Sequence, residues 1–326
     1  MSERVGAASH FDARAIPEGG VEGVWVAPDG DAVRRLDLSP VGPRSRGSLL
    51  FVPGRGDTYE KYLETFCHWR ANGWHVTAID WRGQAGSGRF GRDDLTGHVD
   101  DFSIWLRDLG AFWQVWRGTH PGPHVLVGHS MGGHLALRAV ADGYVDSAVT
   151  VLSTPMLGFF AWGLPLVLQH ALAAAMVRLG DPRRPAWRDG EKPATRLALR
   201  MALLTHDRIR YADEQWWRAK RPYLEMGPAS WGWMERALDS MRHLAAPGVL
   251  ERVTTPVLLL STSADRMVSH RAICAAARRL PQGELVTFGR EARHEILREV
   301  DPVRDRALAA IDSFLDRHVP LPKAQT

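Results

Sequence analysis

The sequence predicts an α/β protein in which a mostly parallel sheet carries helices on both faces and a helical insertion precedes the last strands. Three observations lead to this fold. Short apolar runs alternate with helical patterns over residues 47–152, and such alternation indicates parallel strands joined by crossover helices. The alternation stops at Pro155 and resumes at Val257. In the first part, the turn Gly128-His129-Ser130-Met131-Gly132 joins a strand to a helix.

The individual elements follow from apolar periodicity and turn residues. Apolar runs over residues 21–26 and 32–38, separated by a Pro-Asp-Gly-Asp turn, predict an opening hairpin. Later strands are expected at residues 47–52, 74–79, 125–127, 148–152, 257–260 and 284–288. Helices are expected at residues 58–71, 100–116, 135–140, 271–279 and 297–315.

Residues 155–247 carry no strand pattern, and prolines and glycines divide them into helical stretches. We therefore expect a core built from residues 1–154 and 248–326. Residues 155–247 would form a helical cap over the carboxyl edge of the sheet, where ligands of such folds bind. The opening of this cap, residues 155–177, has no charged side chain and is long enough to span a bilayer. Proline and glycine interrupt it, so we expect a segment that is buried in the protein or covered by a binding partner.

Composition and charge exclude several other classes of protein. The chain is 45% hydrophobic and 24% charged, with a formal net charge of +4. Its arginines are spread along the chain, so no nucleic-acid partner is expected, although weak attraction to an anionic surface is allowed. Cys67 and Cys274 are far apart, which fits no disulfide framework or metal motif and suits a reducing compartment. Residues 1–20 lack the apolar stretch of a secretory signal. We expect a cytoplasmic protein whose cap contacts the inner face of the membrane at most peripherally.

The turn around Ser130 fits the G-x-S-x-G pattern of a nucleophile held between a strand and a helix. In such a turn the serine has strained dihedrals that hold its hydroxyl clear of the sheet. Gly128 and Gly132 are needed because side chains there would collide where strand and helix nearly touch. The backbone N–H of Met131 would point toward a developing oxyanion, whereas His129 is expected to be a packing residue. The alternative is a glycine-rich turn that contains a serine by chance.

A serine nucleophile needs a base, and the base needs an orienting carboxylate. Asp265 directly follows the first strand after the insertion, and His294 lies in the loop after the last strand. Ser130, Asp265 and His294 thus occur in the order serine, acid, histidine, each at the carboxyl end of its own strand. Glu295 and Asp301 are the rival carboxylates.

The second oxyanion donor should come from the loop after the third strand, Pro53-Gly54-Arg55, which makes the backbone N–H of Arg55 the candidate. The chain has no H-E-x-x-H, no Walker A and no G-x-G-x-x-G after a first strand. We therefore expect a reaction that uses neither a metal ion nor an organic cofactor.

Several further segments occur in the order known from one family of proteins. They are Pro53-Gly54-Arg55 with Tyr59-Glu60-Lys61-Tyr62, Asp80-Trp81-Arg82-Gly83, Gly97-His98-Val99, the turn around Ser130, Thr154-Pro155-Met156-Leu157-Gly158 and His294-Glu295-Ile296-Leu297. With them the chain resembles the α/β-hydrolases over nearly all of its length. Within these it looks most like the lysophospholipases and monoacylglycerol lipases of the serine-aminopeptidase-like branch. Pro53 and Ala85 depart from the histidine and glycine usual in that branch, but neither belongs to the triad.

The resemblance implies a serine hydrolase that cleaves the carboxylic esters of single-chain lipids through an acyl-enzyme. Its partner would be a lipid or a small ester. Phe159, Phe160, Trp162, Leu164 and Leu168 would then line an acyl-chain tunnel above the serine, whereas the alternative is a cap that packs on itself. Other functions left open are a monoacylglycerol lipase, a general small-ester carboxylesterase, an aminopeptidase and a non-catalytic binding protein on this fold.

Overall fold

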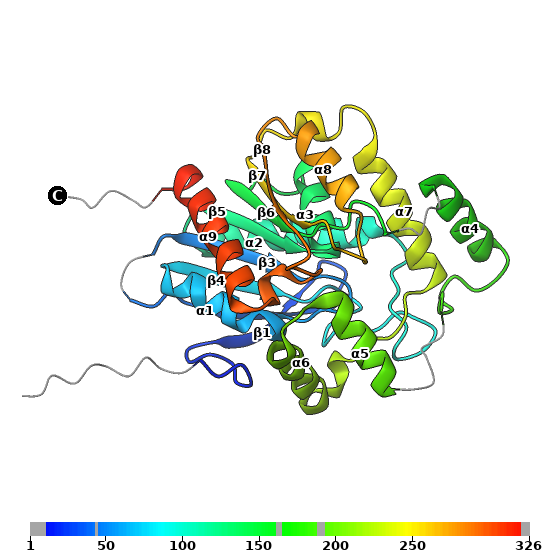
Figure 1. Cartoon of the computed structure of the whole chain (residues 1–326), viewed down its shortest axis with the longest axis horizontal. Helices are drawn as coiled ribbons and strands as arrows, with labels where there is room; N and C mark the ends of the chain where they lie inside the picture. Colours follow the sequence, from blue (N-terminus) through cyan, green and yellow to red (C-terminus); the bar gives the residue numbers. More distant parts are fainter. Residues whose placement is uncertain (1–10, 43–44, 161–164, 188–192, 321–326) are drawn as a thin grey trace, which may run out of the picture.

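The computed structural model describes residues 11–42, 45–160, 165–187 and 193–320. At the centre of the protein is an eight-stranded sheet in the order β1-β2-β4-β3-β5-β6-β7-β8 (Figure 1). The strands are β1 (Val21–Val26), β2 (Ala32–Leu38), β3 (Gly47–Val52), β4 (Trp74–Ile79), β5 (His124–His129), β6 (Val149–Ser153), β7 (Val257–Thr262) and β8 (Gly283–Phe288). Strand β2 is antiparallel to β1 and to β4, and all other neighbours are parallel. The predicted mostly parallel sheet is confirmed.

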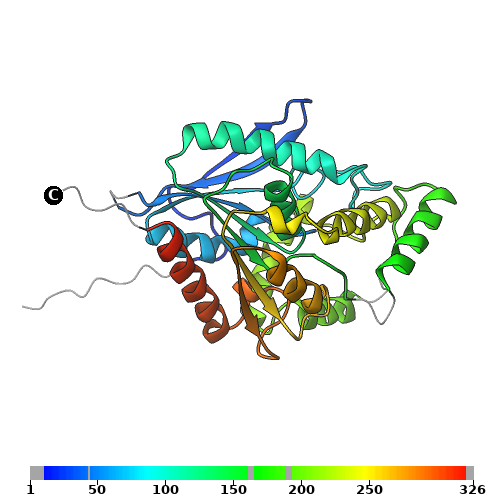
Figure 2. The same cartoon turned by 90° about the horizontal axis from the view of Figure 1, so that it is seen from above.

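Helices cover both faces of this sheet. They are α1 (Leu63–Ala71), α2 (Phe102–Thr119), α3 (Met131–Ala141), α8 (His270–Arg279) and α9 (Asp301–His318). Successive side chains of a strand point to opposite faces, so Leu49 and Phe51 of β3 lie in a buried cluster with α1 and α9. Leu50 and Val52 lie in a second cluster with α2, α3 and α8. Figure 2 shows α2 and α9 on opposite sides of the sheet, which confirms the predicted layers.

Two helices begin differently from the pattern in the sequence. The sequence predicts one helix over residues 297–315, but a short 3₁₀ helix η4 (Ile296–Arg298) precedes α9, which starts at Asp301. Pro302 explains this break, because proline has no N–H and fits the first turn of a new helix. Similarly, the 3₁₀ helix η1 (Tyr59–Tyr62) precedes α1 where a single helix is expected.

The segment between β6 and β7 consists of helices, loops and isolated bridges wherever the structure describes it. Its helices are α4 (Leu166–Arg178), α5 (Pro193–Leu204), α6 (Arg208–Lys220), η2 (Pro222–Leu224) and α7 (Trp231–Ala245), followed by η3 (Leu250–Arg252). They lie in two places: α4 packs against α7 at one end of the molecule, whereas α6 lies apart from this pair (Figure 1). Helix α6 packs against η1. Helix α7 buries Trp233 and Met241 in the cluster with α2, and α6 buries Trp217 in the cluster with α1. The division of the chain at residues 154 and 247 stays a prediction.

Helix α4 comes from the apolar stretch that opens the insertion. Its Val167, Leu168 and Leu172 are exposed, whereas Ala173 is buried against α7. None of the helices in the described ranges combines the length and the apolar character that crossing a bilayer requires.

Candidate active site

Ser130 lies on a strained turn between β5 and α3. Its φ is +51° and its ψ is −115°, a combination that residues with a side chain rarely adopt. The turn requires glycine on both sides of the serine. A Cβ on Gly132 would lie 2.3 Å from the carbonyl oxygens of Val52 and Pro53, and a Cβ on Gly128 would lie 2.7 Å from the carbonyl oxygen of Gly132. Both glycines are thus needed for the close approach that the sequence motif predicts.

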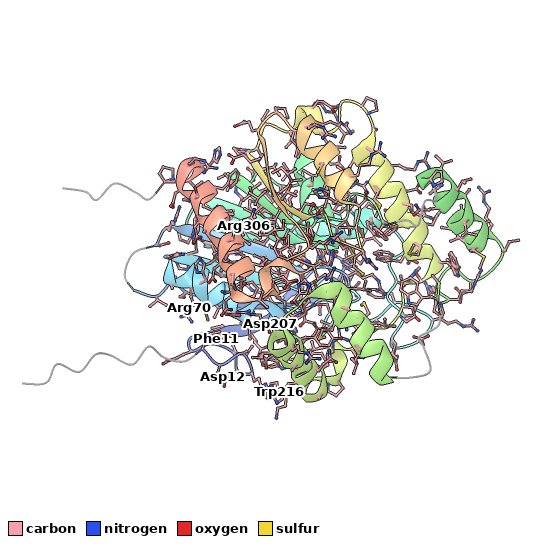
Figure 3. The ribbon with its side chains drawn as sticks, in the orientation of Figure 1. Phe11, Asp12, Arg70, Asp207, Trp216 and Arg306 are labelled. Carbon is pink, nitrogen blue, oxygen red and sulfur yellow. The ribbon has the colours of Figure 1, made fainter. Side chains whose placement is uncertain are left out.

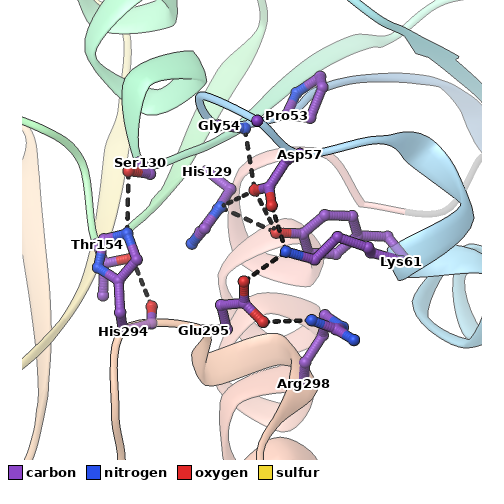
Figure 4. A network of polar contacts seen from close by, with 12 residues as sticks. Pro53, Gly54, Asp57, Lys61, His129, Ser130, Thr154, His294, Glu295 and Arg298 are labelled. Atoms are coloured by element: carbon purple, nitrogen blue, oxygen red, sulfur yellow. Dashed lines mark hydrogen bonds and ion pairs between the residues drawn. The ribbon is translucent and has the colours of Figure 1, made fainter. Parts of the chain in front are cut away.

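The structure brings the three predicted triad residues together at the carboxyl edge of the sheet. Ser130 Oγ is 2.9 Å from His294 Nε2 (Figure 4), and His294 Nδ1 is 2.8 Å from Asp265 Oδ2. The other oxygen of Asp265 accepts hydrogen bonds from the backbone N–H groups of Met267 and Val268, at 2.7 and 3.0 Å. In this arrangement Nε2 can accept a proton from the serine while Nδ1–H donates to the carboxylate.

The two rival carboxylates have other partners. Glu295 pairs with the buried cations Lys61 and Arg298. Asp301 pairs with an arginine of α6 across 2.6 Å. The geometry therefore favours Asp265 as the residue that orients the histidine.

The charges around His294 favour its protonated form. Burial lowers the pKa of the imidazole, but Asp265 outweighs burial, with help from Glu295 and Asp57, and the pKa lies above its ordinary value. Burial also raises the pKa of the Asp265 carboxyl. The imidazole of His294 and the two backbone donors outweigh this effect and hold that pKa below its ordinary value. The site is thus suited to stabilise the imidazolium that forms when the histidine accepts a proton.

The loop predicted to supply an oxyanion donor lies directly against the serine. A Cβ on Gly54 would lie 3.0 Å from Ser130 Cβ. The N–H of Gly54 donates to Asp57 Oδ2 at 3.2 Å, which closes the loop around Arg55. Met131 follows the serine as the first residue of α3. The roles of the Arg55 and Met131 N–H groups as oxyanion donors stay a prediction.

A group of buried ionic side chains lies behind the triad (Figure 4). We call it the rear ionic cluster, and its members are Asp57, Lys61, His129, Glu214, Glu295 and Arg298. Lys61 Nζ pairs with Asp57 and, across 2.5 Å, with Glu295. Arg298 pairs with the same glutamate and, across 2.9 Å, with Glu214. His129 is not only a packing residue, because its Nδ1 lies 2.8 Å from Asp57 Oδ2.

The carboxyl groups of Asp57 and Glu295 in the rear ionic cluster stay charged despite their burial. Burial alone would raise the pKa of the Asp57 and Glu295 carboxyls, but Lys61 outweighs it and both pKa values lie below their ordinary range. Tyr62 donates its hydroxyl to Asp57 Oδ2 at 3.0 Å. Burial and the Asp57 charge raise the pKa of this tyrosine far above its ordinary value, so it remains neutral. Sequence reasoning missed this cluster. The local signals for it are the four-residue spacing of Asp57 and Lys61 and the three-residue spacing of Glu295 and Arg298.

Part of the predicted acyl tunnel lies outside the described residues, namely Trp162 and Leu164. Leu168 lies on α4 and is 54% exposed, with Val167 and Leu172 exposed beside it. These three side chains form an apolar surface rather than a buried lining.

The other two predicted tunnel residues lie beside the loop that carries Asp265. Phe159 forms a β-bridge with Val268, and it packs against the buried cluster that includes α7. The N–H of Phe160 donates to the carbonyl oxygen of Met267 at 3.1 Å, and this phenylalanine is 39% exposed. A tunnel above the serine stays a prediction.

One group of side chains in the described ranges has the composition of a metal site. His170 of α4 meets Glu235 and Asp239 of α7, with His170 Nε2 2.8 Å from Asp239 Oδ1. All three are partly exposed, and Arg236 and Arg242 pair with the carboxylates. Since the arginines supply the balancing charge, the group is best described as a surface ion cluster. That the reaction uses no metal or cofactor stays a prediction.

A cavity of about 390 Å³ lies on the far side of the rear ionic cluster. Its lining comes from the segment before β1, η1, α1, α6 with the residue before it, η4 and the first residue of α9. It includes Phe11, Asp207, Lys61, Glu214 and Arg298. Phe11 and Asp207 lie near each other at α6 (Figure 3). Charged side chains dominate this lining and no triad residue is part of it, so the cavity does not suit an acyl chain.

Comparison with known proteins identifies the family. The family described as serine aminopeptidase, S33, matches residues 43–301. The chain belongs to this hydrolase family. It is 32% identical over 288 residues to lysophospholipase L2 of Escherichia coli strain K12, a match that covers 83% of this chain and 80% of that protein. It is 24% identical over 280 residues to a probable lysophospholipase L2 of Haemophilus influenzae, covering 83% and 84%.

Solved structures of related shape confirm the α/β-hydrolase fold. A soluble variant of monoglyceride lipase from Saccharomyces cerevisiae, in complex with a substrate analog, superposes with a TM-score of 0.72 at 19% identity. That match covers 94% of this chain and 99% of the lipase. A carboxyl esterase from Bacillus coagulans gives a TM-score of 0.70 at 18% identity, covering 92% and 99%. Together with the family match and the 32% identical lysophospholipase L2, these findings confirm the resemblance to the lysophospholipase and monoacylglycerol lipase branch.

Gly132→Ala should destabilise the protein, because the new Cβ would collide with two backbone oxygens at the end of β3. We expect the free energy of unfolding to fall by about 2 kcal/mol or more. Gly118→Ala in α2 is the matched control, since a Cβ there meets nothing within 4 Å. That control should be more stable than the wild type by about 0.5–1 kcal/mol. Urea unfolding followed by circular dichroism measures both variants, and equal stabilities would contradict the role assigned to Gly132.

Proposed function

We propose that this protein is a serine hydrolase that cleaves the carboxylic esters of single-chain lipids. The observation that carries the proposal is the hydrogen-bonded row of Ser130, His294 and Asp265 at the strained turn. The names of the lysophospholipase and monoglyceride lipase relatives support a lipid ester as substrate. A lysophospholipid is the first candidate. A monoacylglycerol and a small soluble ester are the alternatives.

In the proposed reaction, Ser130 Oγ attacks the ester carbonyl carbon while His294 Nε2 takes the hydroxyl proton. Asp265 holds the imidazole in the correct tautomer and stabilises the imidazolium. The backbone N–H groups of Arg55 and Met131 bind the oxyanion, and each such donor contributes roughly 10²–10³ to the rate. The histidine returns the proton to the leaving alcohol. Water, activated by the same histidine, then releases the acid from the acyl-enzyme.

A peptidase that releases N-terminal residues is a weaker candidate. It would need a carboxylate of the insertion to bind the amino group of the substrate. Glu214 is already paired with Lys61 and Arg298, and Asp213 is paired with Arg14 across 2.8 Å. Three further acidic side chains of the insertion also pair with arginines: Glu225, Glu235 and Asp239. These pairings favour an ester over a peptide as substrate.

We also propose that the protein contacts a membrane surface peripherally through the insertion. Helix α4 exposes Val167, Leu168 and Leu172, which could enter the interface of a lipid layer. Arg178 and Arg183 are exposed near the end of this helix and would lie close to anionic head groups. A cytoplasmic location at the inner face of the membrane stays a prediction.

Ser130→Ala and His294→Ala should each abolish hydrolysis of p-nitrophenyl esters while leaving the circular dichroism spectrum unchanged. Asp265→Asn should lower kcat by about 10⁴, because the amide favours the wrong tautomer of the histidine. Asp301→Asn is the matched control and should retain activity. Labelling of the wild type, but not of Ser130→Ala, by a fluorophosphonate would exclude a binding protein without turnover. Loss of activity in Asp301→Asn with full activity in Asp265→Asn would show that the acid is misassigned.

The value of kcat/KM should fall as the pH drops through the pKa of His294, because only the neutral imidazole accepts the serine proton. Neighbouring carboxylates raise this pKa. The midpoint of the fall in kcat/KM should therefore lie at a pH above the ordinary pKa of histidine, which is about 6.5. Asp265→Asn should move the midpoint to lower pH, since it removes the strongest interaction that raises the pKa. A profile that stays flat between about pH 5 and 9 would remove the histidine from the mechanism.

If the insertion binds the acyl chain, kcat/KM should rise several-fold for every two carbons added to the chain of a soluble ester. Each buried methylene contributes ~0.8 kcal/mol, and the rise should end when the binding region is full. Phe160→Asn should flatten this rise without abolishing the hydrolysis of an acetate ester. Val115→Asn, at an exposed position on α2, is the matched control. A preference for the shortest esters would contradict lipid specificity and leave a general small-ester hydrolase.

A further inference from the structure

Lys61 lies at the centre of the rear ionic cluster and joins two loops of the candidate site (Figure 4). Its side chain is 2% exposed. Its Nζ pairs with Asp57 in the loop after β3 and with Glu295 in the loop after β8. The lysine and this glutamate are 234 positions apart in the chain. One ammonium group therefore connects two distant segments, and each of them borders the triad.

Each carboxylate leads directly to a proposed functional group. Asp57 Oδ2 accepts the Gly54 N–H at 3.2 Å, and this bond closes the loop that contains the proposed oxyanion donor. The same oxygen lies 2.8 Å from Nδ1 of His129, and the ring centroid of His129 is 5.0 Å from that of His294. Glu295 directly follows His294 in the chain. A displacement of the ammonium would thus move the oxyanion loop and the imidazole relative to each other.

We propose that Lys61 is a positioning residue: its ammonium fixes the loop that carries Arg55 relative to the loop that carries His294. The inference rests on the proposed function, because the relative position of the loops matters if both act on one ester. The ammonium offers three directed N–H donors, so its bonds fix a geometry that apolar contacts would leave loose. Buried ion pairs contribute little net stability compared with well-packed apolar side chains. Stability alone therefore does not account for a lysine at this position.

The charge of Lys61 is also expected to act on His294, because the lysine lies next to two carboxylates that raise the pKa of this histidine. The groups that act directly on this histidine are Ser130, Asp265, His129, Glu295 and Asp57. Behind them, Lys61 pairs with Asp57 and Glu295, Tyr62 donates to Asp57, and Arg298 pairs with Glu295. Carboxylates favour the imidazolium and cations oppose it. Removal of the lysine charge should raise the pKa of His294, and removal of the Glu295 charge should lower it.

The test compares Lys61→Met, Lys61→Arg and Glu295→Gln with the surface control Lys220→Met, at an exposed position at the end of α6. Lys61→Met should lower kcat about 10²-fold, the effect expected for a misplacement of roughly 1 Å. Its KM should change little, because substrate contacts remain. Lys61→Arg should recover most of the loss, since a guanidinium can bond to both carboxylates. Lys220→Met should match the wild type in both parameters.

The pH dependence of kcat/KM separates positioning from a general loss of structure. The pH at which kcat/KM falls on the acid side should be higher in Lys61→Met and lower in Glu295→Gln than in the wild type. A merely structural defect would not move these two pH values in opposite directions. Glu295→Gln keeps the size of the side chain but weakens its bond to the lysine, because a neutral amide replaces the carboxylate. A fall in kcat of this variant therefore tests the same link if Lys61→Met does not fold.

A wild-type kcat in Lys61→Met, or pH values of this fall that do not move apart, would overturn the positioning role. Fluorophosphonate labelling of Ser130 keeps this result separate from the proposed function. If the wild-type protein is not labelled, the proposed serine hydrolase function is wrong. If the wild type and Lys61→Met are labelled at equal rates, only the proposed role of the lysine is wrong.

Discussion

The close approach of two backbone segments is the constraint on which the candidate site depends. The first turn of α3 lies so near the end of β3 that no Cβ fits at Gly132. This contact leaves Ser130 in a strained conformation and places the loop after β3 beside it. Because β5, β6, β7 and β8 run parallel, the residues after β7 and β8 arrive at the same edge. The arrangement of the backbone alone therefore brings positions 265 and 294 close to the serine.

Charge in the interior adds a second constraint. A buried ion loses its hydration, and the loss is offset when several partners surround it. Glu214 illustrates this point, because Lys61, Arg298 and Arg218 all lie within 3.3 Å of its oxygens. These partners come from η1, η4 and α6, so the cluster is complete only when α6 of the insertion is docked on the core. The support behind the triad and the docking of the insertion thus depend on the same ion pairs.

The sequence allowed the fold and the meeting of Ser130, Asp265 and His294 to be predicted, because each residue follows a strand with a visible apolar pattern. Parallel strands then align these ends without further information. The rear ionic cluster could not be predicted in this way. Charged side chains are ordinarily exposed, and nothing local shows that Lys61 meets a carboxylate 234 positions away. Pro302 near the start of α9 indicates that a new helix begins there. The apolar periodicity continues across this position, so the sequence pattern alone predicts one unbroken helix.

In the proposed enzyme the insertion performs two tasks, although it is one continuous segment of the chain. Helix α6 supplies Glu214 to the rear ionic cluster, and its Arg210 pairs with Glu64 of α1 across 2.7 Å. Ion pairs of fixed geometry therefore hold α6 on the core. Helix α4 instead packs on α7 and presents Val167 and Leu172 to solvent. In the proposed enzyme, support of the triad belongs to α6 and contact with lipid belongs to α4. Residues of α4 can then change with the substrate without disturbing the charges behind the serine.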